Sequence, residues 1–269
     1  MSDITSEQWR HFQDEGYAVL NFRPSPSQLR RMQDEIDAIM LGTTSIDLDR
    51  IMMQLDSTTG KREDVGRNTQ GSQGSTLNYR KIQNLEYVPV FLEYLKSPIF
   101  RNICARIYGT ETSIAVFRSM FMNKPANRGT PLGWHQDCWT YLDRDPILTI
   151  WTALDPATDE NGCLKIIPRS HLCGVINPAN SAGFLTPELA DEHCPPEKAL
   201  RLELEPGEVV MLHNKLLHSS EVNRSSTSRR AFSVCYMDAK TKDTRGLNCA
   251  TVFGTGALSP ADLAPSRSH

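Results

Sequence analysis

Apolar residues near the N-terminus recur at helical spacing. Trp9 and Phe12 share one face of a short predicted helix, and Gly16 ends that helix. A second helix is expected to begin at Pro26, because proline suits the first helical position. Its buried positions are predicted to be Leu29, Met32, Ile36 and Met40. Helical spacing returns over residues 88–108.

The pattern changes twice after the second helix. Residues 42–76 are polar and carry no clear period. A long irregular segment inside a compact domain is typical of a lid or a disordered loop, and we predict a lid here. From residue 113 onward, short apolar runs alternate with turn residues, at 113–117, 148–151, 164–167, 209–212 and 231–236. Strands at this spacing predict an antiparallel sandwich or barrel with the helices packed outside it.

The chain is long enough for one large domain. We expect a mainly β protein with flanking helices, in a single domain over residues 1–258 of the 269 in the sequence. No internal repeat or linker divides this region. Residues 259–269 are expected to form a loose tail.

Composition excludes several classes of protein. The 29 Lys and Arg residues are balanced by 32 Asp and Glu, a net charge of -3, which argues against nucleic acid as a partner. No apolar run approaches the roughly 18–20 residues that span a bilayer, and the first residues do not resemble a signal peptide. The seven cysteines form neither a disulfide framework nor a zinc pattern. These features predict a cytoplasmic protein without a membrane partner, either a monomer or a homodimer.

The local motif with the clearest chemistry is His135-Gln136-Asp137. Residues i and i+2 of a strand point to the same face, so an imidazole and a carboxylate can be presented together. His218, directly after another apolar run, could complete a site of two histidines and one carboxylate. Such a triad leaves coordination positions open for substrate and O2. By itself the His-x-Asp pair is a weak signal, because such pairs also arise by chance on protein surfaces.

Two residues near His218 suit a dicarboxylic cosubstrate. A buried arginine at position 229 could pair bidentately with the carboxylate that does not bind the metal. Ser220 would share the strand face of His218 and could donate to the same carboxylate. Arg230 is the competing cation, but adjacent strand residues face opposite ways and the spacing favours Arg229.

The ordered set of motifs resembles the phytanoyl-CoA dioxygenase-like (PhyH) family of Fe(II)/2-oxoglutarate-dependent oxygenases. The resemblance covers nearly the whole chain. The matching segments are residues 7–17, 134–137, 151–155, 161–164, 167–171, 206–209, 218–223 and 229–231.

This resemblance implies a double-stranded β-helix, a cupin-like jelly roll buttressed by N-terminal helices. It also implies that the triad, His135, Asp137 and His218, is catalytic and holds Fe(II). Arg229 and Ser220 would bind the C5 carboxylate of 2-oxoglutarate, with Trp151 beside that cosubstrate. The carboxylate of the triad is present, which disfavours the halogenase variant of this chemistry.

Other residues are weaker candidates. Lys124 could reach 2-oxoglutarate or substrate, although a salt-bridged role at a sheet edge is equally compatible with its position. Five residues could line the substrate side of the pocket, where several cations would suit an anionic substrate: Tyr79, Arg80, Lys81, Arg118 and Trp139. A solvated surface or core packing is the equal alternative for these five. His171 and His213 are expected to be structural.

The leading hypothesis is a dioxygenase that hydroxylates an unactivated C–H bond of a small metabolite or natural-product intermediate, with succinate and CO2 as coproducts. Desaturation or ring closure would use the same initial chemistry. A zinc-dependent hydrolase or isomerase and a non-catalytic jelly-roll binding protein remain alternatives. A metal-bound hydroxide has no use for a carboxylate clamp, so Arg229 and Ser220 disfavour the zinc enzyme.

Overall fold

The computed structural model describes residues 3–263, and its centre is a pair of antiparallel sheets. The strands of the larger sheet are β1 Tyr17–Val19, β2 Met52–Leu55, β3 Thr69–Gln70, β4 Tyr79–Gln83, β5 Ile114–Lys124, β7 Leu148–Ala153, β10 Val209–His213, β12 Arg229–Asp238 and β13 Thr251–Phe253. The strands of the smaller sheet are β6 Leu132–His135, β8 Leu164–Ile166, β9 Leu200–Leu202 and β11 His218–Ser220.

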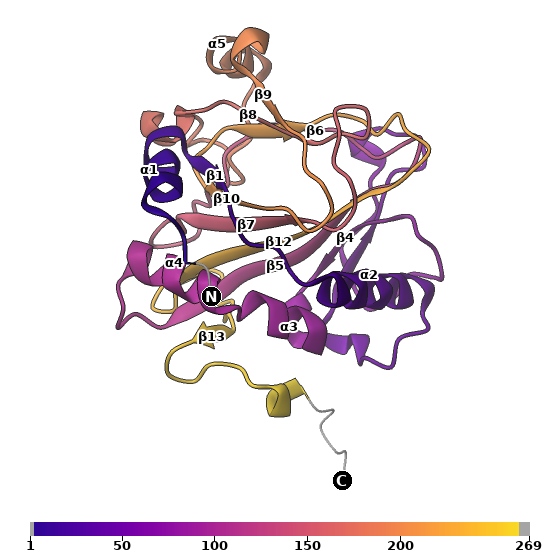
Figure 1. Cartoon of the computed structure of the whole chain (residues 1–269). Coiled ribbons are helices and arrows are strands. Elements are labelled where there is room, and N and C mark those ends of the chain that lie inside the picture. The colour runs from indigo at the N-terminus through magenta and orange to yellow at the C-terminus, as the bar shows by residue number, and fades with distance from the viewer. Residues whose placement is uncertain (1–2, 264–269) are drawn as a thin grey trace.

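The two sheets lie face to face, with the smaller one above the larger one in Figure 1. The larger sheet has the order β1-β10-β7-β12-β5-β4-β2-β3, and β13 also pairs with β5. The smaller sheet has the order β6-β11-β8-β9. This arrangement confirms the predicted jelly roll, a mainly β fold with flanking helices.

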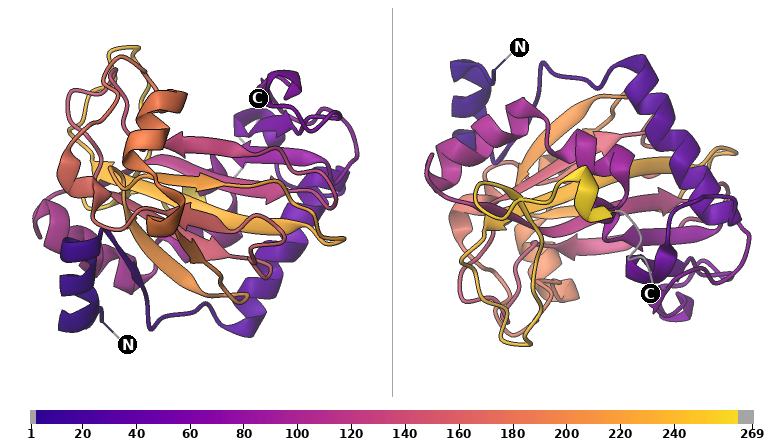
Figure 2. Two further views of the ribbon diagram at one scale, coloured as in Figure 1. Left: turned by 90° about the horizontal axis from the view of Figure 1, so that it is seen from above. Right: turned by 90° about the horizontal axis from the view of Figure 1, so that it is seen from below.

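Helices cover the outer face of the larger sheet. These helices are α2 Pro26–Leu41, α3 Pro89–Leu95 and α4 Pro98–Tyr108, whereas α1 Ser6–Glu15 lies beside the edge strand β1 and α5 Pro187–His193 lies on the side of the smaller sheet (Figure 1). Figure 2 (right) shows α2, α3 and α4 lying across that face. The main hydrophobic core fills the space between these helices and the sheet, and it includes Ile36, Phe91, Phe100, Phe121 and Phe232.

Local signals fix the ends of the N-terminal helices. The Thr5 side chain accepts a hydrogen bond from the backbone N–H of Gln8, whose side chain in turn accepts from the N–H of Thr5. Gly16 ends α1 in the left-handed conformation at φ 84°. In α2, Ser25 caps the first turn and Pro26 occupies the first helical position.

The segment 42–76, predicted from sequence as an irregular lid, contains regular structure. Strands β2 and β3 pair with each other, and β2 also pairs with β4, so the segment extends the edge of the larger sheet. Short 3-10 helices occupy Leu48–Arg50 and Arg62–Asp64. The strand pairing was hard to see in the sequence because β2 and β3 have only four and two residues.

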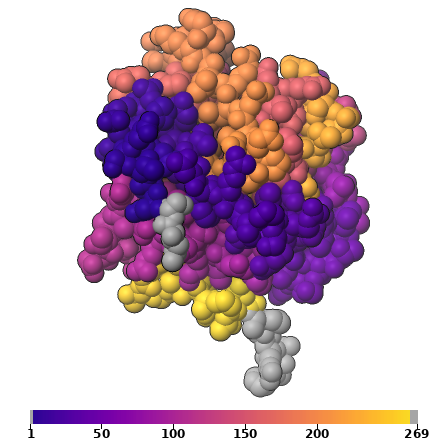
Figure 3. All heavy atoms as spheres, in the orientation of Figure 1, coloured from indigo at the N-terminus to yellow at the C-terminus, as the bar shows by residue number. Residues whose placement is uncertain are grey.

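The C-terminal residues that the structure describes lie against the body of the protein. Residues Pro260–Leu263 form a 3-10 helix that contacts α3, and Leu263 packs against the main core. Figure 3 shows these residues, in yellow, on the lower surface of the molecule. Residues 264–269 of the predicted tail lie outside the described residues. Within the described range, no helix combines the length and apolarity needed to cross a bilayer.

Candidate active site

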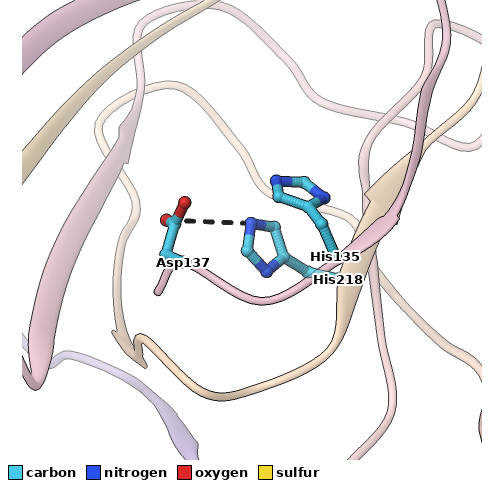
Figure 4. Close-up of side chains that lie close together, drawn as sticks. All are labelled: His135, Asp137 and His218. Atoms are coloured by element: carbon cyan, nitrogen blue, oxygen red, sulfur yellow. Dashed lines mark ion pairs between the residues drawn. The ribbon is translucent and has the colours of Figure 1, made fainter. Parts of the chain in front are cut away.

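The triad predicted from sequence is assembled between two strands of the smaller sheet. His135, the last residue of β6, pairs in register with His218, the first residue of β11. Asp137 follows two residues after the end of β6. One potential ligand atom from each side chain lies within 4.8 Å of the others, and Asp137 Oδ2 is 3.9 Å from His218 Nε2. Figure 4 shows the three side chains close together, with the Asp137 carboxylate facing the His218 ring.

Hydrogen bonds orient both imidazoles for metal binding. His135 Nδ1 donates to the carbonyl oxygen of Gly133 at 2.9 Å, and His218 Nδ1 donates to that of Leu216 at 2.9 Å. A carbonyl oxygen can only accept, so each Nδ1 carries a hydrogen and each Nε2 is the nitrogen that is left to face a metal. The pKa of His135 lies well below its usual range. Burial has the largest effect, and the neighbouring His218 has the next largest. The His135 ring is therefore held in the neutral form that binds metals.

Gln136, between the two ligands, anchors this loop. Its side-chain NH2 donates to the carbonyl oxygens of Gly174 and Lys215, and its oxygen accepts from the N–H of Ile176. The backbone of Gly183 packs against that of Gln136. A Cβ on residue 183 would lie 2.1 Å from the backbone oxygen of Gln136, and the φ of +74° at Gly183 also favours glycine. Both features hold the His-x-Asp backbone in place.

A second part of the site lies where β12 pairs with β5. Arg229 faces the cavity from β12 and is buried, with 3% of its surface exposed. Among the described residues, its Nε and Nη1 have no hydrogen-bond partner, and the same holds for Trp151 Nε1. The guanidinium lies 5.7 Å from the centre of the Trp151 ring. Burial lowers the pKa of Arg229 to about 10, so the side chain stays cationic at neutral pH.

Lys124 is the register partner of Arg229 on β5. Its ammonium group donates to the carbonyl oxygen of Thr130 at 2.8 Å. Burial lowers the pKa of Lys124 to about 6, with Arg229 and Arg80 acting in the same direction. Ser220 lines the same cavity from β11. Buried donors without partners are costly, so this end of the cavity is built for an anion.

Arg230 points away from the cavity. Its guanidinium pairs with both carboxylate oxygens of Asp155, at 2.6 and 2.9 Å, and with Asp37 at 2.5 Å. The alternation of a strand thus separates the two adjacent arginines, as the sequence predicts.

One cavity of about 250 Å³ joins these groups. It is lined by the triad, by Arg229, Ser220, Trp151 and Lys124, and by four of the five predicted substrate residues: Arg80, Lys81, Arg118 and Trp139.

Tyr79, the fifth substrate candidate, does not line the cavity. It is fully buried in the core, where its hydroxyl donates to the carbonyl oxygen of Gly74 and accepts from the N–H of Gln73. A bulge explains this placement: Lys81 pairs with Gln54 whereas Tyr79 pairs with Leu55, so one extra residue breaks the simple alternation of β4.

The comparisons with known proteins agree with this geometry. The family model described as phytanoyl-CoA dioxygenase (PhyH) matches residues 12–231. The chain belongs to this family. The description of this family as a dioxygenase agrees with the predicted enzyme class, and His135, Asp137 and His218 provide the ligand set predicted for iron.

Two curated relatives and one solved structure illustrate the match. A probable phytanoyl-CoA dioxygenase of Caenorhabditis elegans is 29% identical over 58% of this chain, and the match spans 53% of that protein, about half its length. Phytanoyl-CoA dioxygenase 1 of Oryza sativa subsp. japonica is 28% identical over 88% of this chain and 90% of its own. The crystal structure of EctD from S. alaskensis, 20% identical, covers 88% of this chain and 77% of its own with a TM-score of 0.64, which supports the fold.

Several cavity residues of this PhyH protein were not predicted from sequence. Phe184 stacks on the His135 ring, with centroids 4.7 Å apart and an interplanar angle of 17°, and the Arg62 guanidinium lies 4.1 Å from the centre of the Phe184 ring. Arg62 comes from segment 42–76 and Phe184 from a loop, where no periodicity marks either one. Met120 and Met122 also line the cavity, and the alternation of β5 around Lys124 could have identified them.

The two remaining histidines of interest lie outside the cavity. His171 Nε2 donates to the carbonyl oxygen of Gln13 at 3.0 Å. His213 Nδ1 accepts from the N–H of Lys215, and the imidazoles of His171 and His213 lie in contact at a tilt of 46°, with centroids 4.9 Å apart. These contacts fit the structural roles expected from the sequence. Across residues 3–263, the triad is the one cluster of three potential ligands with metal-binding geometry.

Proposed function

We propose that this chain is an Fe(II)- and 2-oxoglutarate-dependent dioxygenase that hydroxylates an unactivated C–H bond of a small molecule. Substrate, O2 and 2-oxoglutarate would give the hydroxylated product, succinate and CO2, with one oxygen atom entering each of the product and succinate. The observation that carries the proposal is the buried Arg229 guanidinium, which has unused donors and opens into the cavity of the triad.

His135 Nε2, His218 Nε2 and one oxygen of Asp137 would hold the iron. Three protein ligands leave three positions open, which suits a chelating cosubstrate and O2. When bound, iron with 2-oxoglutarate supplies the oxidant for the C–H bond. The protein contributes the two imidazoles, the carboxylate and a cavity in which the reactants are held and oriented.

The C5 carboxylate of 2-oxoglutarate would bind at the other end of the cavity. Arg229 would donate to it from Nε and Nη1, and the Ser220 hydroxyl would add a third donor. The Trp151 indole, whose N–H is also without a partner, lies beside this position. Lys124 lies at the same end of the cavity, where its side-chain nitrogen is fixed by its hydrogen bond to the carbonyl oxygen of Thr130.

Segment 42–76 is proposed to act as the lid of this single domain, over residues 1–258. Arg62 from this segment lies over Phe184, which stacks on His135, so the segment already contacts the cavity wall. A lid at this position would keep water away from the reacting centre. A reducing, cytoplasmic location would suit the enzyme, because all seven cysteines are free thiols.

The proposal is tested by anaerobic addition of Fe(II) and 2-oxoglutarate. The chelate should give a weak visible charge-transfer band, which should be lost in Arg229→Ala at moderate 2-oxoglutarate and retained in Arg101→Ala, an exposed arginine of α4. A screen of metabolites for substrate-dependent succinate formation would then identify the substrate, and product analysis would separate hydroxylation from desaturation or ring closure. Absence of the band, together with an unaffected Arg229→Ala variant, would favour the zinc enzyme or the binding protein.

A further inference from the structure

The stretch of β5 that lines the cavity begins with Arg118 and ends with Lys124. Arg118, Met120, Met122 and Lys124 alternate along the strand, and all four line the cavity. At a rise of about 3.3 Å per residue, the backbone positions of Arg118 and Lys124 are about 20 Å apart. Lys124 belongs to the end assigned to 2-oxoglutarate, next to Arg229. Arg118 therefore belongs to a different part of the same cavity.

Three more cations line the same cavity. Lys81 of β4 pairs in register with Met122, and the bulge in β4 lets Arg80 line the cavity as well as Lys81. Without the bulge, the alternation of the strand would send these two neighbours to opposite faces. Arg62 reaches the cavity from segment 42–76.

Acidic side chains offset these four cations only in part: Asp56 acts on Arg80, and Asp137 acts on Lys81. Asp137 is the one carboxylate that lines the cavity, and in the described part of the chain none of the four forms an ion pair. The Arg118 guanidinium lies over the Trp139 ring at 4.6 Å, and its polar contact is a long one, 3.5 Å, with the Tyr141 hydroxyl.

The charge on this side of the cavity is costly to the folded protein. Burial lowers the pKa of Lys81 to about 7, and Arg80, Arg118 and Arg62 act in the same direction against the opposing effect of Asp137. Burial likewise lowers the pKa of Arg80. Four cations that line one cavity without ion-pair partners among the described residues repel one another, and a bound anion would relieve that repulsion.

The proposed cofactors do not provide that anion. One carboxylate of 2-oxoglutarate would go to iron and the other to Arg229. The charge of +2 on Fe(II) is larger than the charge of −1 on Asp137, so Asp137 has no negative charge left over for the other cations. Among the described residues, Arg62, Lys81 and Arg118 therefore still have no ion-pair partner after iron and 2-oxoglutarate have bound.

We infer that Arg118 and Lys81, with Arg80 and Arg62 beside them, form an anion subsite for the oxidised substrate. The substrate is a small molecule with a carboxylate or phosphoryl group, and this group anchors it so that a nearby carbon faces the iron. The cavity of about 250 Å³ is smaller than the roughly 300–1,000 Å³ of typical ligand pockets, so the anchor and the reacting carbon must lie close together. This inference rests on the proposed function for the identity of the iron and 2-oxoglutarate positions.

The test uses two probes, acetate and methylphosphonate, with the anaerobic Fe(II) and 2-oxoglutarate form of the full chain. Iron is paramagnetic, so a probe anion bound in the cavity shows saturable line broadening in its NMR spectrum. The variants are Lys81→Met and Arg118→Gln. Their matched controls are Lys198→Met and Arg101→Gln, which change exposed residues.

Broadening should persist in saturating 2-oxoglutarate, because the two anions occupy different ends of the cavity. Each cavity variant should weaken probe binding by about 10- to 100-fold, the usual effect of losing one charge-assisted hydrogen bond, and the controls should leave it unchanged. The tighter probe identifies the anchoring group as a carboxylate or a phosphoryl group. Loss of the broadening when 2-oxoglutarate is added, or equal binding by variants and controls, would overturn the second subsite.

Calorimetric titration of the same probes into the metal-free protein separates this inference from the proposed function. Anion binding by Lys81 and Arg118 does not need iron. A protein that forms no iron chelate but binds a probe, and loses that binding in both variants, would refute the oxygenase and retain the subsite. Absence of binding by both probes in both experiments would refute the subsite.

Discussion

The adjacent arginines at the start of β12 allow a sharp test of the cosubstrate site. Arg229 faces the cavity with unused donors, whereas Arg230 is engaged by Asp155 and Asp37 on the other face of the sheet. We compare Arg229→Met with Arg230→Met. Both changes remove a guanidinium and leave an unbranched apolar side chain of similar length.

The magnitudes follow from these contacts. Two hydrogen bonds from a charged guanidinium are worth about 1.5–3 kcal/mol each, or about 3–6 kcal/mol together. Arg229→Met should therefore raise the Kd of 2-oxoglutarate by about 10²- to 10⁴-fold. Its thermal stability should not fall, because burial already disfavours the charged side chain and lowers its pKa to about 10. Arg230→Met should leave the Kd unchanged and lose about 1–3 kcal/mol of stability, since it leaves two carboxylates unpaired.

The assays are anaerobic titration of the Fe(II) protein with 2-oxoglutarate, followed by the visible band, and scanning calorimetry of the metal-free protein. Arg229→Met should be impaired in 2-oxoglutarate binding but not in stability, and Arg230→Met should be impaired in stability but not in binding. An Arg229→Met Kd within about threefold of wild type would refute the assignment of Arg229. Loss of 2-oxoglutarate binding in a folded Arg230→Met protein would refute the separation of the two faces.

Three further predictions follow from the site and the core. Asp137→Asn should weaken Fe(II) binding by more than tenfold, measured by competition with a chelator, because a neutral amide replaces the carboxylate ligand. Gly183→Ala should weaken Fe(II) binding and lower the Tm, because the added Cβ would overlap the backbone oxygen of Gln136, whereas Gly133→Ala adds its Cβ in open space and should change neither. Burial raises the pKa of Glu86 from 4.5 to about 7, so the folded state binds the proton more tightly and stability is lost as pH rises from about 4.5 through about 7. Glu86→Gln should remove this loss, about 3 kcal/mol for a shift of about 2.5 units, so its stability relative to wild type should increase between pH 5 and pH 8 in denaturant titrations; a constant difference would contradict the buried-carboxyl explanation.

The parts of the fold with a clear hydrophobic period could be predicted from sequence. The stripe of α2 includes Met32, Ile36 and Met40 as buried residues, and Gly16 ends α1 as the glycine signal indicates. Strands of two to four residues, such as β2 and β3, are too short to show a period. Their pairing depends on contacts with distant strands.

The site was predictable where side chains share one strand face. Alternation places Arg229 and Arg230 on opposite faces, and the structure shows this arrangement. The bulge in β4 could not be predicted, and it sends Tyr79 into the core while two adjacent cations enter the cavity. Arg62 and Phe184 could not be predicted either, because a loop residue reaches a cavity only through the packing of its whole segment.

The long pairing of β5 with β12 explains how one sheet serves both stability and chemistry. The outward residues of the two strands, among them Phe121, Phe232 and Val234, pack into the main core beneath the helices. Their inward neighbours, such as Lys124 and Arg229, line the cavity. A register slip of one residue would exchange the two sets, placing the cations in the apolar core and the aromatic rings in the cavity. The apolar face therefore specifies the register, and the register in turn fixes the positions of the cations that the proposed chemistry requires.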